Sequence, residues 1–368
     1  MKIFVCGTRG IPGIPGGVET HCEALFPLIR QSGIEVTVCR RSAYVHPAQQ
    51  QMSEYRGVRL VDLPSPRKKS LEAILHTLSA VWYARWHGFK IVHIHAIGPA
   101  LAVPFARLLG LKTVVTHHGP DYDRQKWGRA AKLALKLGEW CAVHFSNEMI
   151  AISQTISDLL KTKYGYAAAH RIPNGVHIPV PATATDYLAT LGLEKGRYAI
   201  AVGRFVPEKG FHDLLDAWEK SRPDCKLVLV GDADHESDYS LGLKNRADSL
   251  GVVRTGYING EKLRQIYSHA ALFVMPSYHE GLPIALLEAM SYNLKTVVSV
   301  IPANLEVGLS PECYFETGNT ADLAAKIAQQ LASTAPCDYA KILLNHYNWE
   351  TIAAQTIAVY RRLAGTKS

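Results

Sequence analysis

Short, almost wholly apolar runs alternate with helical patterns along the whole chain, and this alternation limits the fold more than any other feature. The first half contains such a run at residues 2–6, and the second half restarts with another at 198–202. A strand that is apolar on both faces must be covered on both faces, and consecutive parallel strands need helical crossovers. We therefore expect an α/β fold with two Rossmann-like domains. Further strand-like runs lie at 34–39, 59–62, 90–95, 112–116 and 149–153, and at 226–230, 271–275 and 296–300.

The domain boundary is expected in a proline-rich stretch. A chain of 368 residues is too long for one ordinary hydrophobic core. The prolines between Pro173 and Pro181 disfavour regular structure, so we expect one domain over residues 1–175 and a second over residues 176–345. Ligands of open α/β sheets bind beyond the carboxyl ends of the strands. We therefore expect the two parallel sheets to face each other across a ligand-binding cleft.

Positive charge is concentrated in the first half. The whole chain has a formal net charge of +8, but residues 1–175 alone contain 22 Lys and Arg against 11 Asp and Glu. This imbalance predicts an anionic partner: nucleic acid, a membrane leaflet or an acidic substrate. We do not expect nucleic acid, because no basic stripe is interleaved with aromatic residues.

The spacing of the cysteines and the length of the apolar runs indicate the cellular compartment of the protein. The seven cysteines are scattered and have no C-x-x-C spacing, which is typical of small buried residues in a reducing environment. No run of 18 apolar residues is present, and the first residues lack the apolar segment of a signal peptide. We therefore expect a cytoplasmic protein, with peripheral binding to the inner face of the cytoplasmic membrane as an extension of that prediction.

The segment from Ser277 to Val298 combines a strand end, a turn and the start of a helix. Glu280 precedes the helix and Glu288 lies inside it, at most roughly 12 Å away along the helical rise. The N–H groups at a helix N-terminus form a phosphate site. Two carboxylates that flank such a site suit a diphosphate with a hydroxyl-rich ring at each end, as in a nucleotide-diphosphate-sugar. The alternative is a pair of solvated surface glutamates.

A basic loop follows the first strand of the second half, G-R-F-V-P-E-K-G at 203–210. Arg204 and Lys209 lie five residues apart at the carboxyl end of a strand. Both can therefore point at a diphosphate and stabilise the charge of a leaving nucleotide. Taken alone, the loop is also compatible with an exposed basic turn.

Three motifs together resemble the retaining glycosyltransferases of family 4, which have the GT-B fold. They are G-R-F-x-x-E-K-G at 203–210, I-P-N-G-V at 172–176 and E-G-L-P-x-x-L-L-E-A-M at 280–290. The run G-G-V-E-T at 16–20 and the segment W-E-x-I at 349–352 fit the same family, so the resemblance covers nearly the whole chain. We also expect residues 346–368 to form a C-terminal helix that packs back on the first domain.

The resemblance implies roles for the motif residues. Arg204 and Lys209 are implied to hold the donor's phosphates, Glu280 to contact the sugar hydroxyls, and Glu288 to bind the ribose hydroxyls. Backbone groups are implied to contact the diphosphate, the sugar and the base. The implied donor-binding residues are Gly16, Gly17, Gly203, Arg204, Lys209, Gly231, Tyr257, Ile258, Glu280, Gly281, Leu282 and Glu288. The implied catalytic residues are His118, Glu280, Arg204 and Lys209.

Two positions depart from the family pattern. Many relatives have A-x-G-x-P after the second glutamate, whereas this chain has Ser-Tyr-Asn-Leu-Lys at 291–295. Val300 stands where many relatives carry an aspartate before Ile-Pro. These departures leave the geometry of the nearby loops open.

The glycine-rich loop at residues 7–17 also suggests dinucleotide binding. A G-x-x-G-x-x-G pattern follows the first strand, but the G-x-G of the dinucleotide fingerprint is missing. Arg40 and Arg41 stand where an acidic ribose ligand is expected. Because an arginine can bind the 2′-phosphate of NADP, an NADP-dependent oxidoreductase remains an alternative.

Two pairs of histidines lie on or directly after predicted strands. His117 and His118 follow the carboxyl end of the run at 112–116, and His93 and His95 share one face of another strand. By the family pattern His118 looks like the residue at the reaction centre, with His117 as the alternative. His93 and His95 either line the acceptor cleft or pack in the core. The sixteen histidines show no H-E-x-x-H spacing, and the family usually works without metal, so we expect no metal and no cofactor.

A basic segment leads into an amphipathic helical pattern with aromatic residues. Residues 67–69 are Arg-Lys-Lys, and the apolar positions that follow run from Leu71 to Trp86. Core packing explains such a stripe, but an interfacial helix on an anionic leaflet would also suit an acceptor anchored on a polyprenyl lipid.

Together these features predict a retaining, metal-independent glycosyltransferase. It would move a hexose from a nucleotide-diphosphate-sugar to a hydroxyl of a lipid-linked or surface-polysaccharide precursor. The alternatives are a sugar-nucleotide 2-epimerase of the same architecture and the NADP-dependent oxidoreductase.

Overall fold

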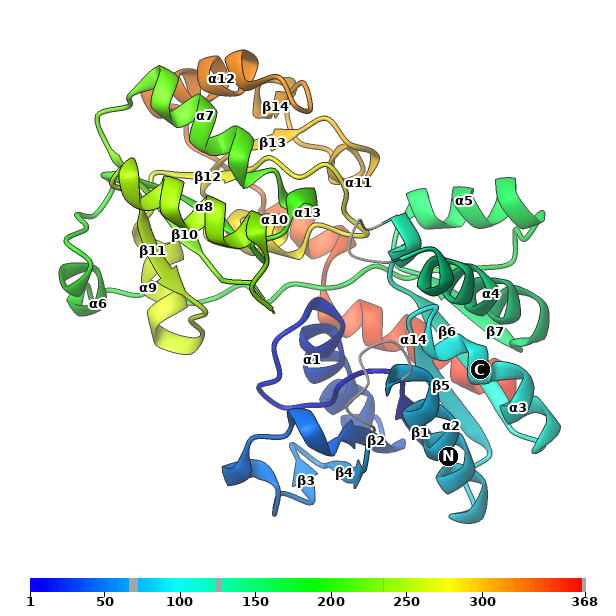
Figure 1. Ribbon diagram of the computed structural model, residues 1–368. Coiled ribbons are helices and arrows are strands. Elements are labelled where there is room, and N and C mark those ends of the chain that lie inside the picture. Colours follow the sequence, from blue (N-terminus) through cyan, green and yellow to red (C-terminus); the bar gives the residue numbers. More distant parts are fainter. Residues whose placement is uncertain (66–71, 124–127, 234, 366–368) are drawn as a thin grey trace. The chain divides into compact units, whose positions relative to one another are not determined.

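The computed structural model describes residues 1–65, 72–123, 128–233 and 235–365, which form two compact units. Met1–Gly175 and Tyr347–Ser368 make up the N-terminal unit, and Val176–His346 make up the C-terminal unit (Figure 1). Each unit is a sheet of parallel strands with helices between them, so the predicted α/β class is confirmed.

The described residues of the N-terminal unit form one sheet in the order β3-β4-β2-β1-β5-β6-β7-β8. All neighbours pair in parallel except the β3–β4 hairpin at the edge. The strands are β1 Lys2–Cys6, β2 Glu35–Arg41, β3 Glu54–Tyr55, β4 Val58–Leu63, β5 Ile91–His95, β6 Lys112–His117, β7 Glu148–Ala151 and β8 His170–Arg171. The helices are α1 Gly17–Gln31, α2 Glu72–Trp86, α3 Val103–Leu108, α4 Arg129–Phe145, α5 Gln154–Tyr164 and α14 Trp349–Ala364.

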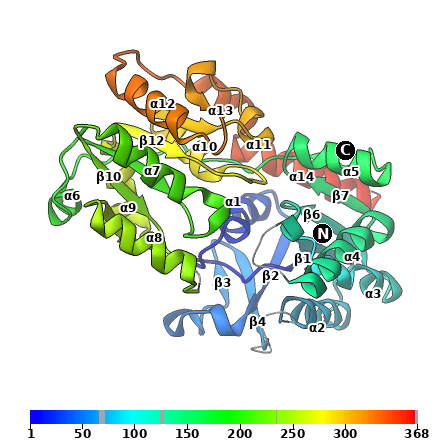
Figure 2. The ribbon, with the colours of Figure 1, turned by 45° about the horizontal axis from the view of Figure 1, so that its top comes forward.

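The C-terminal unit has a parallel sheet in the order β11-β10-β9-β12-β13-β14. Its strands are β9 Tyr198–Val202, β10 Lys226–Val230, β11 Val253–Gly256, β12 Leu272–Met275, β13 Lys295–Ser299 and β14 Tyr314–Phe315. Its helices are α6 Asp186–Thr190, α7 Phe211–Ser221, α8 Asp238–Ser249, α9 Gly260–His269, α10 Ile284–Ser291, α11 Pro302–Leu305, α12 Thr320–Ala332 and α13 Ala340–His346. Figure 2 shows α7 and α12 side by side, and both contribute to the buried core of this unit.

The last helix belongs to the N-terminal unit although it follows the whole C-terminal unit in sequence. Asn348 caps α14 by accepting a hydrogen bond from the backbone N–H of Thr351. Trp349 packs so closely on Gly175 that a Cβ there would lie 2.5 Å from the indole ring. Buried residues of α14 share one apolar cluster with β1, β2 and α1. Burial of this face, rather than helix propensity, therefore holds the C-terminal segment on the sheet.

Candidate active site

The loops after β9 and β10 approach each other more closely than side chains would allow. The N–H of Gly203 donates to the carbonyl of Val230 over 2.9 Å, and Gly231 has a φ of 122°. A Cβ on Gly231 would lie 2.1 Å from the carbonyl oxygen of Gly203, so glycine is required there. Gly203 and Gly231, both predicted donor-binding residues, therefore form one backbone surface at the carboxyl ends of two strands.

Two predicted catalytic residues meet in this unit. Lys209 Nζ lies 2.6 Å from Glu280 Oε1, and Ser277 Oγ donates to the same oxygen over 2.7 Å. The backbone N–H of Tyr278 donates to the carbonyl of Glu208 over 2.9 Å, which joins the two loops. The side chains of Lys209 and Glu280 are 19% and 10% exposed, so both remain accessible to a ligand. Ser277 is not among the predicted site residues, and its place in the strand–turn–helix segment is the only signal for it in the sequence.

Close packing of the residues next to Arg204 and Lys209 fixes the position of these loops. Gly210 has a φ of 66°, and a Cβ there would lie 2.0 Å from the carbonyl oxygen of Pro276. Phe205 is buried, and its N–H donates to the carbonyl of Asp232 over 3.1 Å. Arg204, between Gly203 and Phe205, is partly exposed at the carboxyl end of β9. The basic loop is thus anchored by its neighbours and carries its arginine near the strand ends.

The helix after this loop begins without a side-chain cap. Pro283 occupies the cap position and makes no side-chain capping hydrogen bond, and the N–H groups of Ile284 and Leu286 donate to the carbonyls of Leu282 and Pro283. Gly281 and Leu282 lie immediately before it. A helix start of this kind presents backbone N–H groups and the positive end of the helix dipole, which together stabilise an anion.

Glu288 lies inside α10 and is hydrogen-bonded by a neighbouring phenol. Tyr267 donates its hydroxyl proton to Glu288 Oε2 over 3.0 Å. Burial raises the pKa of the Glu288 carboxyl, and the Tyr267 hydrogen bond partly opposes this rise. Because Tyr267 contacts one oxygen only, the other retains acceptor capacity for ligand hydroxyl groups.

The two residues predicted to border a base lie after β11. The N–H of Gly231 donates to the carbonyl of Gly256 over 3.0 Å, so the loops after β10 and β11 are joined. Tyr257 is 56% exposed, and Ile258 is half-buried. Gly231, Tyr257 and Ile258 therefore lie near one edge of the sheet.

The first departure from the family pattern is explained by the backbone. Asn293, at the position of the family's glycine, has a φ of 54°. Asparagine tolerates the left-handed conformation better than other residues with a Cβ, so the turn keeps the geometry that glycine would give. Lys295, in place of the proline, begins β13, and Val300 is 46% exposed beyond its end.

The glycine-rich loop of the N-terminal unit is held by a glutamate. Glu19 Oε1 accepts hydrogen bonds from the Thr8 hydroxyl over 3.0 Å and from the Arg9 N–H over 2.9 Å. Gly16 has a φ of 147°, and a Cβ there would lie 2.0 Å from Glu19 Oε2. Gly17 then starts α1. The G-G-V-E-T motif is therefore a structural unit in which the glutamate shapes the loop.

The arginines considered for an NADP phosphate are engaged elsewhere. Arg40 is 1% exposed, and its Nη2 donates to Asp62 Oδ2 over 2.9 Å and to the carbonyl of Met52 over 3.0 Å. Arg41 is also buried and lies 3.6 Å from Glu72. These internal ion pairs leave the arginines poorly placed for a 2′-phosphate.

His117 belongs to a buried network rather than to an accessible site. Its Nε2 donates to Glu139 Oε1 over 2.9 Å, while its Nδ1 accepts the Gly119 N–H over 3.1 Å. Glu139 is fully buried and also accepts hydrogen bonds from Tyr164 and Lys163. Burial by itself would raise the pKa of Glu139, but the hydrogen bonds from His117, Lys163 and Tyr164 lower it to about 2.

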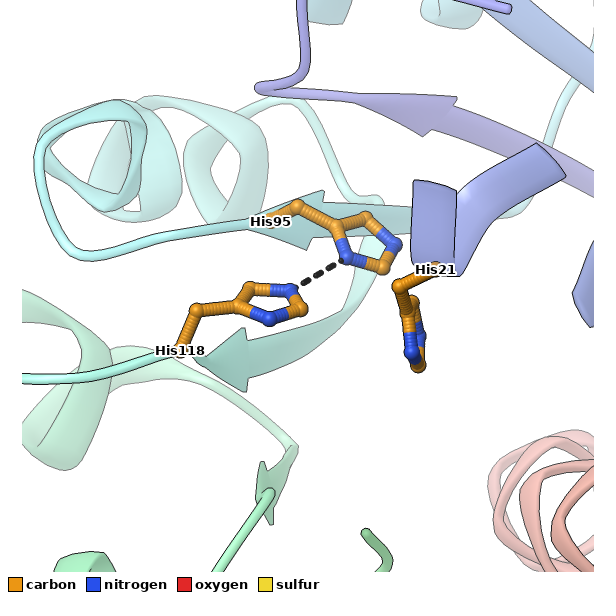
Figure 3. Close-up of side chains that lie close together, drawn as sticks. All are labelled: His21, His95 and His118. Atoms are coloured by element: carbon orange, nitrogen blue, oxygen red, sulfur yellow. Dashed lines mark hydrogen bonds between the residues drawn. The ribbon is translucent and has the colours of Figure 1, made fainter. Parts of the chain in front are cut away.

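His118 instead points toward other histidines (Figure 3). Its Nε2 lies 2.9 Å from Nδ1 of His95, and the ring centroid of His21 lies 5.2 Å from that of His118. Burial lowers the pKa of His21 to about 4, and it lowers the pKa of His95 and His118 well below the ordinary value. His93, on the same face of β5 as His95, is occupied by Tyr360 at 2.6 Å and Thr116 at 2.7 Å.

Apolar side chains are exposed on α2 and α3. Trp82 and Trp86 are 50% and 69% exposed, with ring centroids 5.6 Å apart, and Phe105 stacks on Trp82 at 6.2 Å. Leu108 is 86% exposed. We call Trp82, Trp86, Phe105 and Leu108 the tryptophan patch.

The predicted basic segment at 67–69 and Leu71 lie outside the described residues. Throughout the described part of the chain, no helix is long and apolar enough to cross a membrane.

This pairing of two parallel α/β units, with a basic loop and an uncapped helix at one sheet edge, is the architecture of GT-B glycosyltransferases. The profile of the family "Glycosyltransferase Family 4" matches residues 15–178, and that of "Glycosyl transferases group 1" matches residues 186–342. The chain therefore belongs to the group 1 glycosyltransferases with the GT-B fold, as the sequence motifs predicted.

Individual relatives extend over much of the chain. The chain is 28% identical to an alpha-maltose-1-phosphate synthase of Mycolicibacterium smegmatis, over 99% of this chain and 100% of that protein. It is 27% identical to an O-antigen chain mannosyltransferase B of Escherichia coli, over 79% of each chain. Among solved structures, Anabaena Alr3699/HepE in complex with UDP-glucose is similar with a TM-score of 0.79 at 20% identity, covering 98% of this chain and 100% of that one.

Proposed function

We propose that this glycosyltransferase moves a hexose, with retention of configuration and without a metal ion, from a nucleotide-diphosphate-sugar to an acceptor hydroxyl. The observation that carries the proposal is the meeting of Lys209, Glu280 and Ser277 beside the uncapped start of α10. A cation and a carboxylate thus lie together beside the start of a helix, and these are the groups that a sugar diphosphate requires. The solved UDP-glucose complex of a structurally similar protein supports a nucleotide-sugar donor.

The proposed roles follow from the groups present. Arg204 and Lys209 neutralise the diphosphate, while the N–H groups of Gly281 and Leu282, immediately before α10, stabilise it. Glu280 accepts hydrogen bonds from sugar hydroxyls, and Glu288 accepts those of the ribose. In the N-terminal unit, His118 is the residue we assign to the reacting groups.

The proposed reaction needs no covalent intermediate between the sugar and the enzyme. The bond from the sugar's anomeric carbon to the phosphate oxygen breaks, and its electron pair leaves with the nucleoside diphosphate. The acceptor oxygen forms the new bond on the same face, and its proton passes to an oxygen of the leaving phosphate. Stabilising the departing charge is then the main task of Arg204, Lys209 and the helix end.

A lipid-linked or surface-polysaccharide acceptor is the finer part of the proposal. The O-antigen relative acts in the assembly of such a chain by its name, and the tryptophan patch would let the N-terminal unit rest on a membrane surface. The excess of basic residues in 1–175 would favour an anionic leaflet.

A donor screen followed by product analysis tests the proposal. Nucleoside diphosphates and their sugars are first tested for an increase in the unfolding temperature of the protein. The donors that bind are then incubated with polyprenyl-diphosphate-linked acceptors, and the anomeric configuration of the product is read by NMR. We expect transfer with retention in the presence of a chelator. Conversion of the donor sugar without an acceptor would instead identify an epimerase.

A further inference from the structure

Three imidazoles from three different elements converge in the N-terminal unit (Figure 3). His21 comes from α1, His95 is the last residue of β5, and His118 directly follows β6. One ring nitrogen from each lies within 4.8 Å of the others. The chain thus places three nitrogen donors around one point, although the first and the last are 97 positions apart in sequence.

Two ring nitrogens of this group, His21 Nδ1 and His95 Nε2, are buried and make no hydrogen bond of ordinary geometry within the described residues. The side chain of Asn174 is close enough to His21 to interact with it, so His95 Nε2 is the clearer orphan. Buried polar atoms are nearly always satisfied in folded proteins, so orphaned nitrogens point to a group that they bind.

The three imidazole nitrogens indicate which class of ion or molecule would bind between them. Each imidazole in its neutral form has one ring nitrogen whose lone pair can coordinate a metal ion. Imidazole nitrogens suit zinc-class transition metals, whereas Mg²⁺ and Ca²⁺ prefer oxygen ligands.

We propose that His21, His95 and His118 bind a transition-metal dication of the zinc class. In a tetrahedral zinc site the ligand nitrogens lie roughly 3.4 Å apart, given Zn–N distances of about 2.05 Å. The three ring nitrogens lie within 4.8 Å of one another, so they would have to approach each other to reach that spacing. Three protein ligands leave a fourth position for water, and His118 is partly exposed.

Binding of the ion has a consequence for the reaction. Because His118 is also the residue assigned to the reacting groups, an ion on its ring nitrogen would block transfer. This inhibition rests on the proposed function, whereas the binding of metal does not.

Cobalt and zinc titrations of the full, untagged chain test the proposal. Tetrahedral Co²⁺ absorbs visible light strongly, so its spectrum reports the ligand geometry directly, and calorimetry gives the affinity for Zn²⁺. We expect one ion per chain, and a loss of affinity of at least tenfold in His118→Gln and in His21→Gln. His144→Gln, which replaces an exposed histidine on α4, serves as the matched control and should bind as the wild type does.

The outcomes separate this proposal from the proposed function. Absence of the visible Co²⁺ absorption, or unchanged affinity in a folded His118→Gln protein, would overturn the metal site. His118 is partly exposed, so that variant tests the site even where a substitution of the buried His21 prevents folding. Transfer measured in chelator decides the proposed function independently of any metal result.

Discussion

Lys209 Nζ lies 2.6 Å from Glu280 Oε1, although 71 positions of sequence separate the two residues. The ammonium comes from the turn before α7, and the carboxylate comes from the loop before α10. Each side chain is partly exposed, and each keeps hydrogen-bonding capacity that the pair does not use. In the proposed function, the pair preorganises a cation and an acceptor for a ligand that brings both anionic and hydroxyl groups.

Removal of either partner should reduce transfer for different reasons. Glu280→Ala should lower kcat/KM by about 10²-fold or more, because the sugar loses an oriented acceptor. Lys209→Met should weaken nucleoside diphosphate binding by roughly tenfold, because the diphosphate loses a charged donor. Steady-state kinetics and calorimetry measure the two effects. Glu312→Ala, at an exposed position, is the matched control, and wild-type turnover by folded Glu280→Ala protein would contradict the assignment.

Glu288 should control nucleotide affinity rather than turnover. Glu288→Gln keeps the shape of the side chain but removes the charge that accepts two ribose hydroxyls, so the affinity for free nucleoside diphosphate should fall about tenfold. Tyr267→Phe removes only the phenol that holds Glu288 at 3.0 Å, and its effect should be smaller. Calorimetry of both variants gives the comparison. A larger loss in Tyr267→Phe than in Glu288→Gln would argue that the phenol, not the carboxylate, meets the ligand.

The tryptophan patch should bind anionic vesicles in a salt-dependent manner. Replacing both exposed rings in Trp82→Ser/Trp86→Ser removes apolar area that would enter the interface, so sedimentation with vesicles should fall at least tenfold. Transfer to a short water-soluble acceptor should be unchanged. Leu305→Ser, at an exposed position in the C-terminal unit, is the control. Equal sedimentation of all three proteins at low salt would refute membrane docking at this surface.

Glu139 should make the N-terminal unit sensitive to acid. Its folded pKa of about 2 lies below the ordinary value of 4.5, so the ionised carboxylate stabilises the folded state. This contribution is complete above pH 4.5 and is lost as the pH falls toward 2. The linkage amounts to roughly 3 kcal/mol. Glu139→Gln should therefore lower the unfolding temperature at pH 7 and flatten its dependence on pH between 5 and 3. A mutant that keeps the wild-type acid dependence would show that another group is responsible.

Local sequence patterns predicted most of the fold. The alternating apolar runs at 198–202 and 226–230 became β9 and β10, and the expected helix start after Glu280 became α10. The two-residue strands β3, β8 and β14 were missed, because so short a segment carries no periodicity and forms only where a neighbouring strand offers hydrogen bonds.

The candidate site was predicted less completely. Motif residues such as Lys209 and Glu280 could be named from their segments, but their direct contact could not, because a contact between distant segments depends on how strands order in the sheet. Asn293 shows the same limit of prediction from sequence. The residue type differs from the glycine of the family pattern, but its φ of 54° gives the turn the same left-handed backbone conformation. The implied roles of the motif residues stay predictions until ligand binding is measured.

By itself the sequence determined the α/β class, the family and the segments that carry charged and glycine-rich motifs, since periodicity and local motifs are encoded in neighbouring residues. Tertiary structure alone decided which of these segments meet. It placed His117 in a buried network with Glu139 and its neighbour His118 beside His95 and His21, because successive residues at a strand end face opposite sides of the sheet. That alternation separated the histidine that bonds Glu139 from the histidine that joins the cluster of His21 and His95.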